Sequence, residues 1–335
     1  MSDISTGCWR LRRARNDLGD GASPAWAGRE PRYSRAALPI GPGRRAADTA
    51  GRYFRAILFA GLASFSFEPA RAESVTQAAP ADSQDDRFSP EAQQNDAQQL
   101  GNPIANMTII PFNNNFDYGG GFNNRALRYT LNVQPLIPIP LNSDWNLITR
   151  TTIPFLDWQN VVPNDTHITT LGDIAQQFFL SPAKSVSGIT WGAGPILSYP
   201  TATNPTLGSE QWGAGLTGVV VGIQGPWLFA LHGFHLWGVA DATSLRVPYM
   251  NQTFLQPVVQ YTFPTHTNVF VSSEATYNWT TRQWLVPLQV GANQLFRVGD
   301  QLISFGGIAR YYVDRPENGP RWGFQLRLTL LFPNK

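Results

Sequence analysis

Hydrophobic and polar residues alternate with a period of two along most of the chain downstream of Met107. This period is typical of a β-strand whose two faces meet different surroundings. The clearest segments are residues 127–137, 253–263, 284–292 and 324–332. In the last of them Phe and Leu alternate with Gln, Arg and Thr. The chain is therefore predicted to be all-β.

Extending the pattern along the chain predicts twelve antiparallel strands. Turn-forming residues separate the alternating segments, as expected for strands joined by turns and loops. The predicted strands are residues 107–116, 125–138, 145–155, 172–181, 188–200, 212–223, 227–237, 251–263, 268–279, 283–296, 302–313 and 321–332.

Short and long connections alternate between these strands. Residues 141–144 and 297–301 are short, 117–124 and 156–171 are long, and only 280–282 is short for its place. Outer-membrane barrels have short periplasmic turns and longer external loops, and an even strand number puts both ends of the barrel on the periplasmic side. Backbone groups in hydrocarbon must be bonded internally, so the sheet must close. The pattern predicts a transmembrane antiparallel β-barrel in the bacterial outer membrane.

Tryptophans near the predicted strand ends support this interpretation, because their rings suit the membrane–water interface. A membrane helix is the alternative for the uncharged stretch 217–240, where Gly218 and Gly222 make a G-x-x-x-G match. Residues 224–226, Gln-Gly-Pro, break that stretch, so two strands with a tight turn are predicted instead. The tryptophans predicted to form an interfacial belt are Trp145, Trp191, Trp212, Trp227, Trp237 and Trp284.

Residues 52–72 have the order of a secretory signal peptide. A positive segment is followed by the largely apolar residues 56–67 and by an Ala-x-Ala motif, so cleavage is predicted between Ala72 and Glu73. The apolar stretch is too short to span a bilayer. Residues 1–51 are rich in Arg, Ala, Gly and Pro, and we expect them to be disordered or to lie upstream of the true translation start.

The segment 73–104 is rich in Gln, Asp and Ala and contains six acids and one arginine. It is predicted to be a periplasmic extension or a plug for the barrel, with a disordered linker as the alternative. A short helix is expected over 96–100, ended by Gly-Asn-Pro at 101–103. The barrel itself is predicted over 105–335.

Composition supports a wall between lipid and water. Charged residues make up 14% of the chain and aromatic residues 12%, and the mean hydropathy is -0.21. This is poor in charge for a soluble domain and too polar for a bundle of membrane helices. The formal charge of +2 comes from the arginine-rich head, because after cleavage at Ala72 the chain has 13 basic and 17 acidic residues, a net charge of −4. The arginines of the head have no interleaved aromatic platform that could stack bases, so nucleic-acid binding is not predicted.

Strand alternation points a set of charged and aromatic side chains into the lumen. These residues are candidates for contact with a solute, since the arginines outnumber the glutamate and the phenylalanines offer apolar surface. Alternatively, the arginines pair with Glu274, Asp173 or the acidic segment 73–96 and brace the interior, and the phenylalanines fill it. The lumen candidates are Arg128, Arg150, Glu274, Arg310, Arg327, Phe179, Phe234, Phe254 and Phe270.

Catalytic and metal sites are not predicted. His232 and His235 are three residues apart, which places them on opposite faces of a strand and disfavours a zinc pair. An outer-membrane lipid hydrolase would need a serine near a histidine base, and no nearby serine shares the face of His235 on its strand. The only cysteine, Cys8, lies in the head, so the mature chain has no thiolate site. No metal, cofactor or enzymatic activity is expected.

Several segments between residues 96 and 335 resemble an outer-membrane family named for the meta-cleavage pathway of phenol degradation, whose members are labelled transporters. The resemblance implies an outer-membrane barrel that passes aromatic or other hydrophobic compounds, and it brings no catalytic residues. The segments that carry it are 111–119, 144–154, 171–174, 194–203, 207–215, 251–257, 309–313 and 322–333.

The leading hypothesis is a passive channel for small solutes, with hydrophobic or aromatic molecules as the favoured class. The alternative is a structural or interaction barrel with a plugged lumen, and a lipid hydrolase is the least favoured. The expected partners are outer-membrane lipids, a small-molecule solute, and the barrel-assembly machinery, which would act through the C-terminal strand.

Overall fold

The signal peptide predicted at 52–72, its cleavage site after Ala72 and the extension 1–51 lie outside the residues that can be described. Among those that can, no helix is both long and apolar enough to cross a bilayer. The computed structural model describes residues 89–121, 124–162, 167–243 and 248–333.

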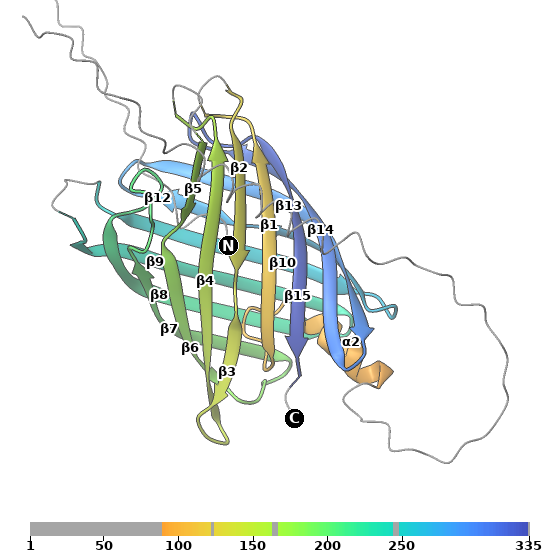
Figure 1. Ribbon diagram of the computed structural model, residues 1–335. Helices are drawn as coiled ribbons and strands as arrows, with labels where there is room; N and C mark the ends of the chain where they lie inside the picture. Colours follow the sequence, from red (N-terminus) through yellow and green to blue (C-terminus); the bar gives the residue numbers. More distant parts are fainter. Residues whose placement is uncertain (1–88, 122–123, 163–166, 244–247, 334–335) are drawn as a thin grey trace, which may run out of the picture. The chain divides into compact units, whose positions relative to one another are not determined.

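The described chain is one helix followed by β-strands (Figure 1). Most strands alternate between buried and more exposed residues, as the sequence predicts. The elements are α2 (Pro90–Gln99), β1 (Thr108–Tyr118), β2 (Leu127–Val133), β3 (Leu136–Pro140), β4 (Trp145–Gln159), β5 (His167–Leu171), β6 (Ile174–Pro182), β7 (Ile189–Tyr199), β8 (Gln211–Gln224), β9 (Trp227–Asp241), β10 (Asn251–Thr262), β11 (Thr267–Ser273), β12 (Ala275–Asn278), β13 (Gln283–Val298), β14 (Gln301–Asp314) and β15 (Trp322–Phe332).

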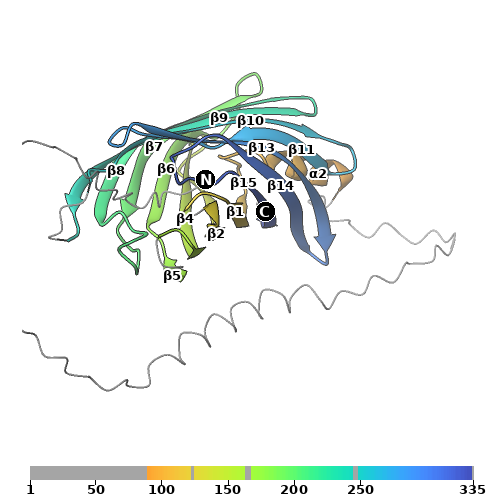
Figure 2. The same ribbon diagram turned by 90° about the horizontal axis from the view of Figure 1, so that it is seen from above.

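The sheet closes on itself. Neighbouring strands pair antiparallel around the circuit, and β15 pairs with β1 from Phe332 opposite Thr108 to Trp322 opposite Tyr118. Figure 2 shows the resulting barrel from above. Three positions of the circuit are each filled by two successive pieces: β2 with β3 and β11 with β12, which pair with the same two neighbours, and β5 with β6, which both pair with β4. The barrel therefore has twelve strands, and the predicted fold class and strand number are confirmed.

The breaks in these three strands have local causes. Pro135, between β2 and β3, has no N–H to give to the ladder. Asp173, between β5 and β6, is fully buried, and its carboxylate accepts hydrogen bonds from the backbone N–H groups of Ala202 (3.0 Å) and Ser209 (2.6 Å). It therefore ties the connection between β7 and β8 to the wall and does not pair with a lumen arginine. Glu274, between β11 and β12, belongs to a lumen network.

The strands extend further on the external side than the sequence pattern predicts. The predicted connection 156–171 is wrong, because β4 continues to Gln159 and β5 begins at His167. Outward side chains are polar there, and the carboxylate of Asp157 contacts the ring of His167. The inward side chains form a buried apolar cluster beneath the external loops. Its members are Ala126, Leu156, Trp158, Val161 and Leu207.

The outer face is an apolar belt with aromatic side chains near both ends of the strands. At the end that carries the two termini of the barrel, Trp145 packs edge-on against Trp191, and Trp227 against Tyr261. The six predicted tryptophans lie in these girdles, and all but Trp145 are exposed on the outer face. This face, on a closed sheet, is that of an outer-membrane β-barrel in contact with lipid. The girdle at the opposite end contains Tyr118, Tyr199, Trp212, Trp237, Tyr277, Trp279, Trp284 and Trp322.

Helix α2 lies at the end of the barrel that carries the C-terminus, which short turns mark as periplasmic (Figure 1). Ser89 is its N-cap, with the hydroxyl accepting a 3.1 Å hydrogen bond from the N–H of Ala92, and Pro90 fills the first turn. Because of this cap the helix starts earlier than the predicted 96–100.

Candidate functional site

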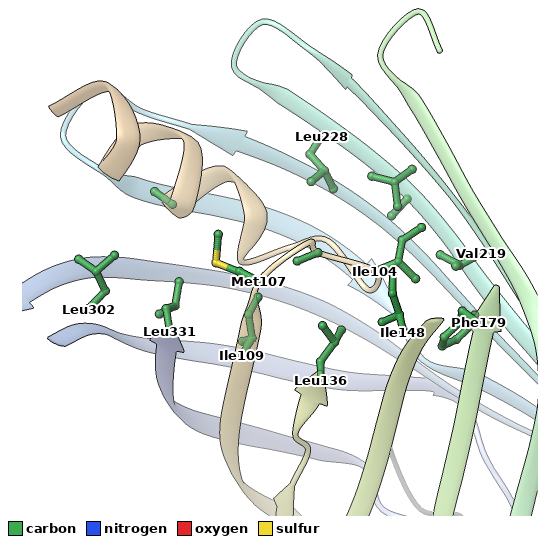
Figure 3. Close-up of a cluster of buried hydrophobic side chains, with 14 of the residues drawn as sticks. Ile104, Met107, Ile109, Leu136, Ile148, Phe179, Val219, Leu228, Leu302 and Leu331 are labelled. Atoms are coloured by element: carbon green, nitrogen blue, oxygen red, sulfur yellow. The ribbon is translucent and has the colours of Figure 1, made fainter. Parts of the chain in front are cut away.

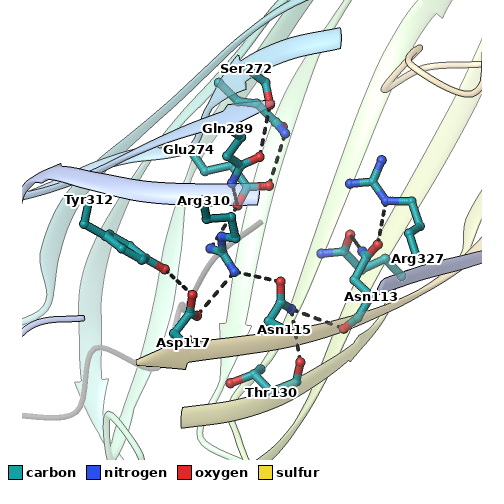
Figure 4. A network of polar contacts seen from close by, with 12 residues as sticks. Asn113, Asn115, Asp117, Thr130, Ser272, Glu274, Gln289, Arg310, Tyr312 and Arg327 are labelled. Carbon is teal, nitrogen blue, oxygen red and sulfur yellow. Dashed lines mark hydrogen bonds and ion pairs between the residues drawn. The ribbon is translucent and has the colours of Figure 1, made fainter. Parts of the chain in front are cut away.

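The lumen holds a buried ion network on the side formed by β1, β13, β14 and β15 (Figure 4). Its centre is Arg310 of β14, which is 3% exposed. Nη1 of Arg310 donates to Oδ1 of Asn115 at 2.8 Å and lies 3.3 Å from Oδ2 of Asp117. The hydroxyl of Tyr312 donates to the other oxygen of Asp117 at 2.8 Å. The arginine thus meets a carboxylate that is already fixed by a second donor.

Glu274 is the second carboxylate of this network. Its Oε2 lies 3.8 Å from Nη2 of Arg310 and accepts a 3.1 Å hydrogen bond from Gln289, and its Oε1 accepts one from Gln256 at 3.3 Å. Ser272 in turn donates to Gln289 at 3.0 Å. The break between β11 and β12 allows Glu274 to face these partners. Arg310, Asp117 and Glu274 therefore brace the wall across several strands, as the second of the two predicted roles requires.

Arg327 and Arg150 have fewer protein partners. Nε of Arg327 donates to Oδ1 of Asn113 at 2.8 Å, and its guanidinium lies 5.7 Å from the centre of the Phe270 ring. Within the described residues, Nη1 of Arg150 is shielded from solvent and has no hydrogen-bond partner. Both side chains, with Glu274, line a cavity in the lumen. Of the four lumen arginines, these two make the fewest hydrogen bonds to described residues.

Arg128 faces inward but serves the external loops. Its two terminal nitrogens donate to the backbone carbonyls of Gly119 (2.9 Å) and Asn318 (2.7 Å), and its guanidinium lies 5.6 Å from the centre of the Trp158 ring. It joins two loops above the lumen. The structure therefore separates Arg128 from the other three lumen arginines.

The opposite side of the lumen is apolar and aromatic. Phe179, Phe234 and Phe254 surround His232, with Phe234 and Phe254 stacked at 4.8 Å between ring centres. His232 is fully buried, and its Nε2 lies 2.8 Å from the side-chain oxygen of Gln177. The fourth predicted phenylalanine, Phe270, lies apart from this group beside Arg327. The lumen therefore has a charged side and an aromatic side.

The chain that precedes β1 enters the periplasmic half of the lumen, and we call residues 89–107 the N-terminal insert. Its buried side chains Ala97, Ile104, Ala105 and Met107 pack against an apolar ring on the inner face of the wall (Figure 3). The insert therefore lies at the level of this ring, whereas the charged network and the stacked Phe234 and Phe254 lie outside it. The ring consists of Ile109, Leu136, Ile148, Phe179, Val219, Val221, Leu228, Ala230, Leu295, Leu302 and Leu331.

Hydrogen bonds fix the C-terminal end of α2 to the wall. Asn268 donates to the carbonyl of Ala97 at 2.7 Å, and Gln260 donates to the carbonyl of Gln98 at 3.1 Å. The side chain of Gln98 donates to the carbonyl of Gly225 at 2.7 Å. The wall thus satisfies two of the carbonyls that a helix end leaves free. The buried carboxyl of Asp96 is not satisfied in this way, because its Oδ2 has no hydrogen-bond partner among the described residues. Burial raises the pKa of this carboxyl to about 6.

Two cavities lie on either side of the insert. The lumen cavity, about 100 Å³, is bounded by residues 100–103 and by wall residues that include Arg150, Glu274 and Arg327. The second, about 490 Å³, lies at the periplasmic mouth between the insert and the ends of β4, β6, β7 and β8. Asn102 lines both cavities. Residues around Asn102 therefore form the partition between them.

Three important lumen residues, Asn115, Asp117 and Tyr312, are absent from the sequence-based candidates. Asp117 was assigned to the loop 117–124, but β1 continues to Tyr118. The sequence does contain a signal for Asp117. Aromatic residues that face outward, Phe116 and Tyr118, stand on both sides of it, so the alternation of the strand continues to residue 118. Tyr312 lies two residues after Arg310 and shares its inward face.

The two histidines on β9 lie on opposite faces of the wall, as predicted. His235 belongs to the outer face, where its Nδ1 lies 2.8 Å from the hydroxyl of Thr253 and its ring packs against Trp237. Among the described residues, the hydroxyl next to each histidine is that of a threonine, Thr253 for His235 and Thr217 for His232. Neither arrangement is the serine–histidine pair that the hydrolase hypothesis requires.

Comparison with known proteins gives likeness in fold. No known family model matches the chain, and no curated protein matches its sequence. Among solved structures, the COG4313 outer membrane channel from Pseudomonas putida F1 is similar, with a TM-score of 0.55 and 17% identity over 69% of this chain and 98% of that one. At this identity the likeness shows the fold: an outer-membrane barrel of nearly the same extent as the described chain.

Two more distant barrels also match. An outer membrane phospholipase from Salmonella typhi has a TM-score of 0.37 and 15% identity, over 72% of this chain and 96% of that chain. A FadL homologue from Pseudomonas aeruginosa has a TM-score of 0.35 and 9% identity, over 72% and 92%.

Proposed function

We propose that the protein is an outer-membrane channel for the passive passage of small solutes and that the N-terminal insert is its plug. One observation carries the proposal. The periplasmic half of the lumen is filled by a segment that is not part of the wall, and this segment has one cavity on its lumen side and another at the periplasmic mouth. A barrel whose lumen is merely filled needs only side chains of its own strands.

The lumen has a charged side and an aromatic side. This supports a solute class of hydrophobic or aromatic compounds that also carry a polar group. The phenylalanines around His232 offer apolar surface to a ring. The opposite side offers guanidinium and amide groups. A solute with both kinds of surface replaces contacts with water on each side.

Conductance in planar bilayers tests the proposal. The mature protein is compared with a variant that lacks residues 73–104, after heat-modifiable mobility in gels shows that both barrels have folded. If the insert is a plug, the deletion raises the single-channel conductance and allows small solutes into liposomes. Equal, negligible conductance in both proteins would contradict the channel and would favour a structural or interaction barrel.

The partners follow from the same proposal. The outward belt contacts outer-membrane lipid, and the C-terminal strand β15, with its outward Phe324, Leu326 and Leu328, is the segment that we propose the barrel-assembly machinery recognises.

A further inference from the structure

We infer that the lumen cavity is a binding site for a small monocarboxylate with an apolar body. The inference rests on the proposed channel function, because the ligand reaches the cavity through the barrel, and it narrows the solute class to acids. Four features of the cavity carry it: an unpartnered arginine, a second arginine held over a ring, the balance of charge, and apolar walls.

Arg150 supplies the first feature. It lies on β4, opposite Leu136 of β3 and Gln177 of β6, and it lines the cavity. Within the described residues its Nη1 has no hydrogen-bond partner although it is shielded from solvent. A buried donor without a partner costs free energy, and an arginine most readily recovers that cost from a carboxylate that accepts two parallel hydrogen bonds.

Arg327 supplies the second. Its Nε is bonded to Asn113 and its plane is held over Phe270, so the guanidinium has a fixed orientation. Gly291 lies beside that ring, and a Cβ at Gly291 would come within 2.6 Å of the Phe270 ring. A side chain at this position would displace the Phe270 ring, so the glycine allows the ring to pack against Arg327. A guanidinium oriented in advance loses less freedom when it binds a planar anion.

Charge and size set the class of ligand. The charged side chains among the residues that line the cavity are Arg150, Arg327 and Glu274, which leaves a net charge of +1 and matches a monoanion. A volume of about 100 Å³ exceeds that of a few waters and falls below the roughly 150 Å³ cavity that accommodates benzene. The volume of the cavity therefore matches an acid of about four carbons, and a benzene ring needs more room.

The walls favour a carboxylate over inorganic phosphate. Ile109, Leu136, Val258 and Phe270 line the cavity beside the arginines. Phosphate has no apolar part to cover this surface, and its second charge would be repelled by Glu274. The alkyl chain of a short carboxylic acid covers it and keeps a single charge.

Calorimetric titration of the folded mature protein tests the inference. The probes are butyrate, its neutral analogue butyramide, and inorganic phosphate, with benzoate and benzamide as a larger pair. Because the site supplies charge-assisted hydrogen bonds, butyrate is expected to bind tenfold or more tightly than butyramide. Equal binding of the acid and the amide, or equally tight binding of phosphate, overturns the inference.

Arg150→Gln is the decisive variant. Within the described residues Arg150 makes no hydrogen bond or ion pair that the substitution could break, so the variant barrel should fold. Its affinity for butyrate should be about tenfold lower. Arg297→Gln, at an exposed periplasmic turn, removes the same charge outside the lumen and should leave binding unchanged. Unaltered binding in Arg150→Gln overturns the site. Conductance is measured separately: binding without conductance defeats only the channel, and conductance without acid preference defeats only the site.

Discussion

At the scale of single residues, the most constrained group is Arg310. It connects Asp117 of β1 to Glu274 at the break between β11 and β12, and Asn115 and Tyr312 complete the surroundings. Replacing both partners of a buried ion pair with neutral groups is often tolerated, whereas removing one partner leaves a buried charge without compensation. The network is therefore sensitive to single substitutions and tolerant of matched ones.

Arg310→Met should destabilise the barrel by about 3–5 kcal/mol, because the carboxylates of Asp117 and Glu274 lose their common cation. Urea-induced unfolding in lipid vesicles, followed by tryptophan fluorescence, measures the loss. The triple variant Arg310→Met, Asp117→Asn, Glu274→Gln should recover most of it. A single variant as stable as the parent protein would show that the network contributes nothing to folding.

At the scale of elements, the sequence predicts a strand well where the strand crosses lipid. There every second side chain must be apolar, and β13, β14 and β15 follow this pattern along almost their whole length. Outside the bilayer both faces meet water, so the alternation disappears although the ladder continues. The outer ends of β4 and β5, where Asp157 contacts His167, were missed for this reason.

The docking of α2 should depend on pH. Burial raises the pKa of Asp96 to about 6 from an ordinary value of 3.8, so the docked helix favours the protonated carboxyl. Docking is therefore strongest below about pH 4, weakens as the pH rises towards 6 and stays weaker above it. The docking equilibrium should fall by roughly ten- to a hundredfold across this range. Channel opening in bilayers between pH 4 and pH 7.5 measures the effect.

Asp96→Asn provides the matched control, since it keeps the shape of the side chain and removes the titration. Its opening should be low and nearly constant over the same range. If the parent protein and Asp96→Asn have identical pH profiles, the carboxyl does not control the position of the insert.

At the scale of the whole molecule, closure creates contacts that no local pattern contains. Parity along a strand predicts that Arg310 and Arg327 face inward, and both do. It does not predict their depth, because depth follows from the stagger between strands. Arg310 meets Asp117 only because β14, β15 and β1 become neighbours when the barrel closes. For the same reason the sequence did not reveal that Arg128 belongs to the external loops and Arg150 to the cavity.

The position of the barrel in the membrane can be tested by comparing arginine substitutions at two valines of the outer face. Val290 and Val298 both lie on the outer face of β13 and both are 57% exposed. Val290 pairs with Ala309 near the middle of the strand, whereas Val298 lies at the periplasmic turn opposite Gln301. An arginine on the lipid face costs about 2–4 kcal/mol at the midplane and about 0–1 near the interface. Val290→Arg should therefore lower the free energy of unfolding in vesicles by about 2–4 kcal/mol relative to the parent protein. Val298→Arg should lower it by at most about 1 kcal/mol. Equal losses in the two variants would mean that the aromatic girdles do not mark the edges of the hydrocarbon.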